Sequence, residues 1–437
     1  MKNLKRTISS LLVLVLLLSC AACMNTVDEE ETTTKPTDNI ITTTEAVEEN
    51  IANTYLEYCD YSEGLAWIKY ENKNGDFWGC INKSGEVVFD LSADDIIKVT
   101  PFSNGYAYIE QNECYKTIDN TGKTVATYNI DDKNSVLAFG DGYVLSKKYQ
   151  ADFDSSEYTI SVHNIDGSII DSFSDDYINY DLYNYCGKGV FELSNSYDEV
   201  RFFSINSKKW IDYEMDTTNC YYGRNVNFYD DKMLVGIIYT DDNYSFEYMD
   251  TNGNFTSDKF GDWNTDFGYI WKKEPGPIND GVLAFNCGSD EYVGLFSFDF
   301  STGTMKKIPD TYRDKVIDDD LHKPLMFEDG CISLLLRGSD DETYVGLFDS
   351  NWKAIMEPIK ISDDGYFPVS CERLVVKTTT ETVVYDLSGQ VVFTPSNNGY
   401  YNILPYADDV ARVEGESQPT YLDKEGNLLF DEIDMSK

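Results

Sequence analysis

The chain has 437 residues, of which 42% are apolar and 14% aromatic, enough to bury a large core built from strands. Its formal net charge of −42 at pH 7 repels phosphate backbones and anionic lipid headgroups, so we expect no nucleic-acid partner. A basic ligand, a divalent cation or a neutral glycan is compatible with this charge, and solubility at a crowded cell surface is its simplest explanation.

Residues 1–19 show the pattern of an export signal. Three basic residues within the first six positions precede an apolar run over residues 11–18, which is too short to span a bilayer as a permanent helix. The segment 17–20 (Leu-Leu-Ser-Cys) resembles a bacterial lipobox. This resemblance implies that Cys20 becomes the diacylated first residue of the mature chain and anchors it, outside the cytoplasm, to the bacterial cell membrane. Cys23 is a weaker candidate for this role, and an ordinary signal peptide is the alternative.

Residues 20–53 differ in composition from the rest of the chain. They are rich in acidic residues and threonine and poor in apolar residues. Such a segment cannot offset its ordering entropy by burial, so we expect a disordered tether that its acidic charge keeps extended. Removal of the signal takes away three of the 35 basic residues and none of the 77 acidic ones, so the mature chain carries a charge near −45.

Eight further cysteines are scattered singly along the chain. An exported protein can oxidise its cysteines, but a chain with its own core does not need disulfides, so we expect most of the eight to be small buried residues. Their spacing and the presence of only two histidines argue against a zinc site. We expect neither a metal nor a cofactor.

One pattern recurs over residues 54–437, in nine units of about 43 residues. In the first unit an aromatic residue, small or acidic residues and a glycine (residues 61–64) lead into a strand-like run at 65–69. A second run ends in a turn of the form Asn/Asp-x-x-Gly at 82–85, and a third apolar run at 87–89 leads to the next unit. No long apolar stripe with helical spacing interrupts the units, so we expect an all-β repeat protein.

Each unit has room for three or four short strands. In the Asn/Asp-x-x-Gly turn the first side chain caps the turn and the glycine takes the position with positive φ, so the units are predicted to be hairpins joined into small sheets. A closed β-propeller of seven to nine blades protects the edges of such sheets, whereas an open β-solenoid would stack the same units in a line. We favour the propeller because units of this length with three or four strands are typical of its blades.

The first unit resembles a WG repeat, whose pattern is an aromatic-Ser-Glu-Gly-Leu-Ala strand, a Trp-Gly strand and an Asp-x-x-Gly-Lys-x-Val turn. The likeness rests on residues 61–66, 78–79 and 81–88. The two ends of a second copy match residues 102–107 and 119–125. Later units match less well. The resemblance implies a propeller-like interaction module in an exported bacterial lipoprotein, and it brings no catalytic residue with it.

Few residues suit catalysis or metal binding. A nucleophilic Ser or Cys usually needs a histidine base, but we expect His163 to be a solvated or core-edge residue of a strand and His322 to be a solvated loop residue. Residues 250–253 (Asp-Thr-Asn-Gly) form half of a calcium loop and lack its first and last ligands, while 318–320 and 340–342 are acidic runs that we expect to be solvated. With 77 acidic residues present, no carboxylate pair stands out as that of a glycosidase.

Trp263, Tyr269 and Trp271 lie between two units. Aromatic rings there can stack on sugar faces or fill a protein interface, so these three are the candidate ligand-binding residues, and a hydrophobic plug between blades is the alternative. The sequence therefore predicts a non-catalytic, surface-anchored binding or scaffold protein with a protein or glycan ligand. A glycan-processing or carbohydrate-binding propeller, and a purely structural envelope component, are the alternatives.

Overall fold

The structure is a computed structural model that describes most of residues 54–434. The described segments are 54–93, 95–130, 134–152, 155–175, 180, 182–195, 199–214, 220–222, 228–229, 231–240, 243–259, 279–289, 292–313, 315–316, 326–362, 367–395, 402–414, 416 and 418–434. The predicted export signal, the lipidation residue Cys20 and the predicted tether lie outside these segments.

The described residues form nine antiparallel sheets, which we number in chain order. Strands that follow one another in the chain lie side by side, except that β17 and β18 of sheet 5 both pair with β19. The first four sheets have four strands each. They are sheet 1 (β1, Thr54–Tyr58; β2, Leu65–Asn72; β3, Gly75–Asn82; β4, Val87–Ser92), sheet 2 (β5, Ile96–Val99; β6, Tyr106–Gln111; β7, Cys114–Asp119; β8, Thr124–Asn129), sheet 3 (β9, Asn134–Gly140; β10, Tyr143–Asp152; β11, Ser155–His163; β12, Ile169–Asp175) and sheet 4 (β13, Leu182–Gly187; β14, Val190–Ser194; β15, Glu199–Ser204; β16, Lys209–Glu214).

Sheet 5 has five described strands, and each later sheet has three. They are sheet 5 (β17, Cys220–Tyr222; β18, Phe228–Tyr229; β19, Lys232–Thr240; β20, Asn243–Asp250; β21, Phe255–Lys259), sheet 6 (β22, Val282–Ser289; β23, Tyr292–Asp299; β24, Thr304–Lys307), sheet 7 (β25, Cys331–Arg337; β26, Thr343–Asp349; β27, Ile359–Lys360), sheet 8 (β28, Arg373–Lys377; β29, Thr382–Asp386; β30, Val391–Phe393) and sheet 9 (β31, Ile403–Ala407; β32, Val410–Val413; β33, Thr420–Leu422). The one helix among the described residues is the short α2, Asp310–Arg313.

The central strands of the sheets are buried on both faces, so they read as nearly continuous apolar runs. β25 is buried at five of its seven positions, and β14 at all five, although two of these are Glu192 and Ser194. In β2, Trp67 packs toward sheet 2, whereas Ile68 and Tyr70 pack toward sheet 9. This burial on two sides explains why the sequence shows a strict alternation of apolar and polar residues only in places.

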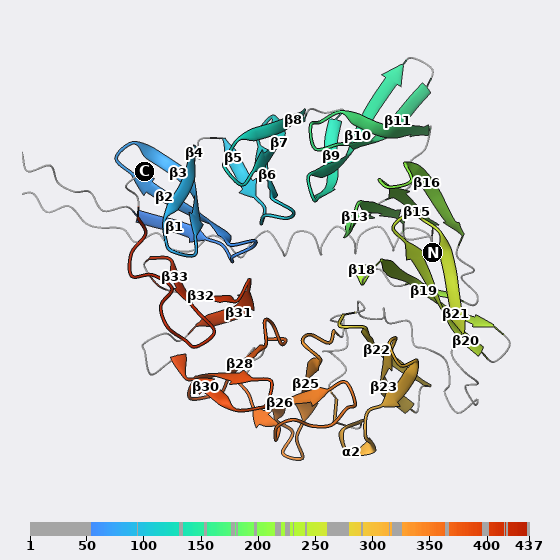
Figure 1. Cartoon of the computed structure of the whole chain (residues 1–437), viewed down its shortest axis with the longest axis vertical. Helices are drawn as coiled ribbons and strands as arrows, with labels where there is room; N and C mark the ends of the chain where they lie inside the picture. Colours follow the sequence, from blue (N-terminus) through green and yellow to red (C-terminus); the bar gives the residue numbers. More distant parts are fainter. Residues whose placement is uncertain are drawn as a thin grey trace, which may run out of the picture. The chain divides into compact units, whose positions relative to one another are not determined.

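Apolar clusters join each sheet to the next. Buried side chains connect sheets 1–2, 2–3, 3–4, 4–5, 6–7, 7–8 and 8–9. Sheets 5 and 6 meet where the ring of Phe246 lies 5.0 Å from that of Phe298. A cluster that contains Tyr61 and Tyr421 joins sheet 9 back to sheet 1, so the contacts form a closed circuit (Figure 1).

The Asn/Asp-x-x-Gly turn of one sheet packs on the outer part of the preceding sheet. Phe89, seven positions after the start of the sheet 1 turn, lies so close to Gly122 of the sheet 2 turn that a Cβ atom there would be 2.5 Å from the ring. Gly122, with a φ of 80°, therefore provides both the turn and the space. We call such a contact between two neighbouring sheets a seam. In six other seams the residue seven positions after the start of one turn contacts the glycine position of the next turn: Ala126 contacts Gly167, Ile211 contacts Gly253, Lys306 contacts Trp352, Met356 contacts Gly389, Phe393 contacts Gly426 and Phe430 contacts Gly85.

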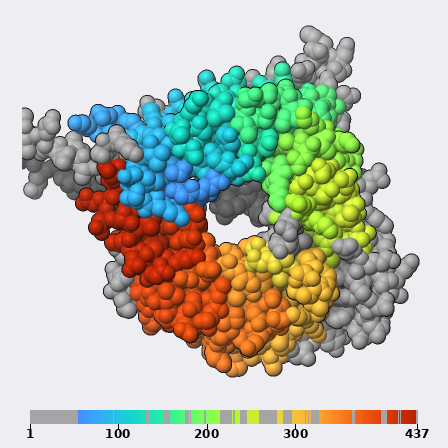
Figure 2. Space-filling view, viewed as in Figure 1, coloured from blue at the N-terminus to red at the C-terminus, as the bar shows by residue number. Residues whose placement is uncertain are grey.

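The segment after β33 closes the circuit. Phe430 lies against Gly85 of sheet 1, in the position that Phe89 takes in the next seam. Asp434 then pairs with the outer edge of sheet 1, where its N–H donates to Gly85 O (2.8 Å) and its carbonyl accepts from Val87 N (3.2 Å). In Figure 2 the residues of sheet 9, in red, lie directly against the blue residues of sheet 1.

Polar contacts also stabilise the packing of sheet 9 against sheet 1. The Arg412 side chain lies 2.8 Å from the carboxylate of Asp60, and its guanidinium lies 5.5 Å from the centre of the Tyr58 ring. The hydroxyl of Tyr421 donates to the carbonyl of Cys59 (2.7 Å).

The prediction of an all-β repeat protein of the propeller class is confirmed.

Candidate binding face

A tight turn leads into the longest pair of strands in most sheets. In eight of the nine sheets both central residues of this turn have positive φ, as at Glu63 and Gly64 (53° and 79°) or Asp408 and Asp409 (51° and 63°), which makes it a type I′ turn. The strand pair runs away from this turn and returns to the Asn/Asp-x-x-Gly turn, such as 82–85, so both kinds of turn lie at the same end of each sheet. We call the surface that these two sets of turns form the turn face.

Carboxylates on the turn face connect consecutive type I′ turns. Asp408 of sheet 9 accepts a hydrogen bond from Gly64 N of sheet 1 (2.6 Å). Glu63 of sheet 1 in turn accepts from Asn104 N (2.6 Å) and Gly105 N (2.8 Å) of sheet 2. The side chain of one turn therefore occupies the exposed N–H groups of the next.

The same linkage recurs on sheets 6 to 8. Asp280 accepts from Gly330 N of sheet 7 (2.9 Å). Asp329 accepts from Glu372 N of sheet 8 (2.7 Å), and its neighbour Glu328 accepts from Cys371 N (3.0 Å). Partial burial of its carboxyl raises the pKa of Glu328 above its usual value.

Sheets 2 to 4 use hydroxyl groups for this purpose. Ser103 of sheet 2 donates to Asp141 of sheet 3 (2.7 Å), and Asp141 also accepts from the hydroxyl of Tyr185 (2.7 Å). The Tyr185 oxygen itself accepts from Gly189 N of sheet 4 (2.8 Å). The turns of sheets 2, 3 and 4 are thus connected through one carboxylate and one phenol.

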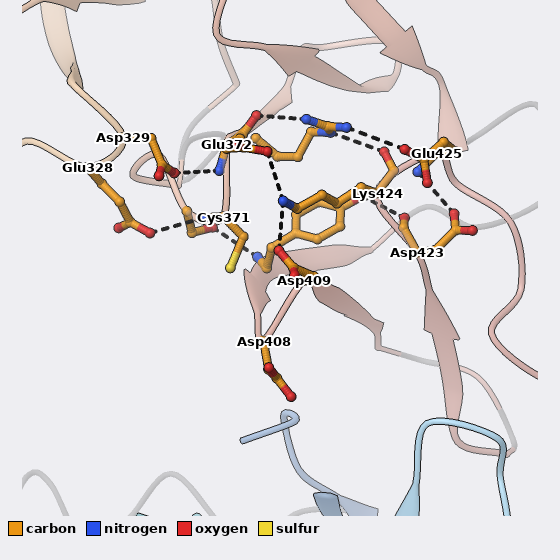
Figure 3. A network of polar contacts seen from close by, with 12 residues as sticks. Glu328, Asp329, Cys371, Glu372, Asp408, Asp409, Asp423, Lys424 and Glu425 are labelled. Carbon is orange, nitrogen blue, oxygen red and sulfur yellow. Dashed lines mark hydrogen bonds and ion pairs between the residues drawn. The ribbon is translucent and has the colours of Figure 1, made fainter. Parts of the chain in front are cut away.

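Lys424 is the centre of an ionic network between sheets 8 and 9 (Figure 3). Its ammonium lies 2.7 Å from Asp409 and 2.9 Å from Glu372. The hydrogen bond from Lys424 lowers the pKa of Asp409. Arg373 donates to the carbonyl of Lys424 (3.1 Å) and lies 3.7 Å from Glu425.

The turn face stays acidic around this network. The side chains of Asp409 and Glu425 remain 64% and 67% exposed although each has a basic neighbour. Lys83 of sheet 1 continues the network, since its ammonium lies 3.2 Å from Asp408. The face is therefore a rim of fixed carboxylates whose exposed oxygens can accept hydrogen bonds from cationic groups.

The partial calcium loop at 250–253 is a capped turn. One carboxylate oxygen of Asp250 accepts from Asn252 N and Asn254 N, both at 2.9 Å, and the other accepts from the Asn254 amide. Both oxygens thus serve the turn itself. Among the described residues no group of three or more His, Cys, Asp or Glu is placed to hold a metal ion.

The acidic run 340–342 forms local contacts in the loop between β25 and β26. Asp340 accepts from the hydroxyl of Tyr344 (3.0 Å), and Asp341 lies 2.7 Å from Arg337. Glu342 lies 3.1 Å from Lys360. The run 318–320 lies outside the described residues.

His163 belongs to the packing between sheets 2 and 3. Its Nε2 lies 2.8 Å from Ser146 Oγ, its Nδ1 lies 3.2 Å from Gly167 O, and its ring meets that of Tyr128 edge-on at 5.2 Å. Burial lowers the pKa of His163, which keeps the ring neutral at pH 7. Both ring nitrogens have partners inside sheet 3, as expected for a histidine at the edge of the core, whereas His322 lies outside the described residues.

Six cysteines have free thiols, namely Cys59, Cys80, Cys114, Cys186, Cys331 and Cys371. Cys80, Cys186 and Cys331 are buried, and burial raises the pKa of Cys80 to about 12 and that of Cys331 to about 11. Protonated, enclosed thiols are poor nucleophiles. These three are buried as expected, whereas Cys59, Cys114 and Cys371 are only partly buried.

The candidate ligand-binding residues Trp263, Tyr269 and Trp271 lie outside the described residues, as does Cys20. The structure instead brings together residues that sequence reasoning missed, namely the carboxylates at the first central position of the type I′ turns. Their signal was visible in the sequence, because Glu63, Asp141, Asp280, Asp329 and Asp408 stand at the same place in their repeats.

No known protein family matches the chain, and no curated protein matches it in sequence. Among solved structures it is similar to BamB from Moraxella catarrhalis, with 11% identity, a TM-score of 0.36 and coverage of 75% of this chain and 94% of that one. It is also similar to dipeptidyl peptidase 4 from Porphyromonas gingivalis, with 10% identity, a TM-score of 0.43 and coverage of 78% and 60%. Such low identities and TM-scores identify no ligand or activity for this chain. Within its described part, no helix has the length and apolar character needed to cross a bilayer.

Proposed function

We propose that the chain is a non-catalytic binding or scaffold protein, held by a lipid on Cys20 at the outer face of the bacterial cytoplasmic membrane. The turn face is the surface that meets its partner. The partner is a protein with a basic patch, because the rim of this face is acidic and the whole chain carries a charge of −42.

The observation that carries this proposal is the linkage of the turns. Glu63 accepts from two backbone N–H groups of the following turn (2.6 and 2.8 Å) and Asp329 from one (2.7 Å), so these side chains are already held in place before any partner arrives. A surface that is fixed in advance loses little conformational entropy on binding. Carboxylates used in this way stabilise the face and are not free to act as catalytic acids or bases.

The lipobox-like segment 17–20 supports the anchor. Two acyl chains on one residue suffice for stable membrane attachment. We expect the full chain to sediment with membranes and the Cys20→Ala variant to be released into the soluble fraction. The Cys23→Ala variant is the matched control and should stay with membranes. Equal release of the two variants would contradict lipidation at Cys20.

The binding role is tested by photo-cross-linking in cells that produce the full chain. A photoreactive amino acid at Asn104, an exposed residue of the turn face, should give a discrete adduct with one protein. The same amino acid at Lys73, in the turn at the opposite end of sheet 1, should not. Adducts of equal yield from both positions would show that the turn face is not the binding surface.

The glycan alternative gives a different result. A glycan ligand would leave both photo-cross-linking positions without a protein adduct, and the purified chain would retain glycans on an array. Turnover of a retained glycan would contradict the non-catalytic role itself. The cross-linking and array experiments together therefore separate a protein-binding role from a glycan-binding or glycan-processing one.

A further inference from the structure

Strongly exposed large apolar side chains are few among the described residues. They are Leu56, Ile97, Ile169, Met326, Val391 and Leu428. Three of these six share one place in the repeat, five positions after the start of the Asn/Asp-x-x-Gly turn, on the outer edge of their sheets. Single exposed apolar residues need no explanation, but recurrence at one repeat position does.

The equivalent residue of sheet 1 is covered. Val87 is only 3% exposed, because the segment that ends at Asp434 lies along this edge. Asp434 forms a parallel bridge with Glu86, and Ile433 packs into the cluster that contains Val87. The chain thus shows on its own sheet 1 what such an edge accepts, namely an extended segment with an aliphatic side chain next to the paired residue.

The same edge is open on sheet 8. Val391 is 57% exposed, and the turn before it has the geometry of the sheet 1 turn, since Asp386 N donates to Gln390 O (2.9 Å) as Asn82 N donates to Glu86 O (3.0 Å). This geometry directs Val391 N–H away from its own sheet, as it does for Val87. The edge therefore offers a backbone donor beside an aliphatic surface.

Sheet 3 provides a natural contrast. Ile169 is 61% exposed at the same repeat position. The carbonyl of Gly167, which corresponds to the Gly85 carbonyl that accepts from Asp434, already contacts His163 Nδ1 at 3.2 Å. This edge therefore retains the backbone N–H donor, but its carbonyl acceptor is already in use.

The geometry points to the outer edge of sheet 8, around Gly389 and Val391, as a docking site for an extended segment of a partner protein. The segment adds as a parallel strand and places an aliphatic side chain against Val391. It is neutral or basic, because the chain's charge of −42 opposes the approach of an acidic one. This inference rests on the proposed binding function and names a second surface for it.

The test uses fluorescent peptides of residues 428–437 and fluorescence anisotropy with the purified full chain. In a neutral peptide, Asp431, Glu432 and Asp434 are replaced by Asn, Gln and Asn. We expect the neutral peptide to bind at least about threefold more tightly than the acidic one at low salt. Methylation of its backbone nitrogen at position 434 should abolish binding, because the N–H that pairs with the edge is lost.

Variants of the full chain locate the site. Val391→Asp should weaken binding of the neutral peptide at least about fivefold, whereas Ile169→Asp and Thr124→Asp, at the same repeat position of sheets 3 and 2, should leave it unchanged. Circular dichroism confirms that each variant is folded. Binding that is absent, or that Val391→Asp does not change, overturns the inference. The proposed function survives that result if the cross-link from Asn104 is still formed.

Discussion

The seams between sheets 1 and 2 and between sheets 6 and 7 have the same space between the turn of one sheet and the outer part of the preceding sheet. In one seam a residue of the preceding sheet fills this space, and in the other a residue of the turn does. In the first seam Phe89 of the preceding sheet covers Gly122 of the turn. In the second seam Trp352 stands at the glycine position with a φ of 60°, and its indole donates to the carbonyl of Lys306 (3.2 Å). The volume is filled in both seams, while the residue that fills it changes.

The difference shows which terms decide the choice of residue. A residue with a side chain at positive φ costs about 1–2 kcal/mol. Trp352 is fully buried against Phe327 and Phe348, and burial of an aromatic side chain contributes about 1.5–3 kcal/mol or more. The backbone strain at this turn is therefore offset by packing, and glycine is needed where a side chain of the preceding sheet fills the space instead.

Removal of the indole should have the largest effect. We expect Trp352→Ala to lower the free energy of unfolding by about 3–5 kcal/mol, because it leaves a cavity between sheets 6 and 7. Urea unfolding followed by circular dichroism measures this loss. The double variant Lys306→Phe with Trp352→Gly, which copies the seam between sheets 1 and 2, should recover part of it. A double variant less stable than Trp352→Ala would break the comparison.

A side chain in the opposite seam should have the next largest effect. Gly122→Ala combines a positive φ with a Cβ atom 2.5 Å from the Phe89 ring, and we expect it to cost about 2–4 kcal/mol. Gly303→Ala is the matched control, because Gly303 also has positive φ (63°) but has open space around its Cβ position. That variant should cost only about 1–2 kcal/mol. Equal losses in the same urea titration would show that Phe89 does not limit the space.

The linkage of the turns should contribute less than the packing of the seams. In Glu63→Gln one acceptor oxygen becomes an amide donor that faces a backbone N–H of Asn104 or Gly105. We expect a loss of about 1–2 kcal/mol in the urea titration. The change should affect sheets 1 and 2 and leave hydrogen exchange in sheet 7 unaltered. A loss below the error of the measurement would mean that these turns are held by the seams alone.

The smallest effect should be a dependence on pH. Hydrogen bonds from Ser301 and Thr302 lower the pKa of Asp299 in the folded chain. A carboxyl whose pKa is lower in the folded state stabilises the fold above its unfolded pKa, and this contribution is lost as the pH falls through the folded pKa. We expect Asp299→Asn to remove this part of the acid sensitivity, so stability should fall less steeply below pH 4 than in the unchanged chain. Identical pH profiles in thermal melts would contradict the assignment.

Local chemistry explains what the sequence could predict. Turns such as 82–85 were predicted correctly, because Asn82 caps the turn through contacts only two and four residues away. The contacts between turns were not predicted, since Glu63 reaches residues 41 and 42 positions further along the chain. The positive φ of Trp352 could not be predicted either, because the turn pattern has glycine at that position.

Part of the missed information was present in the sequence. The interval of seven residues between the start of a turn and the side chain that covers the next turn leads from 82 to Phe89, from 386 to Phe393 and from 423 to Phe430. This interval predicts that the segment after sheet 9 covers the turn of sheet 1. The fold class could therefore be predicted from the pattern that the repeats share, whereas the closing contact requires the spacing between neighbouring repeats to be compared.

The closing seam differs from the others in how far apart its partners lie in the chain. Ser62 contacts Phe102 across 40 positions, but Tyr58 contacts Val413 across 355. Contacts between near neighbours in the chain form early in folding, whereas distant ones must first meet the entropy of a long loop. If the chain is exported from its N-terminus, as we propose, its sheets can assemble one after another as they emerge, and we expect the docking of the segment around Phe430 onto sheet 1 to be the last folding step.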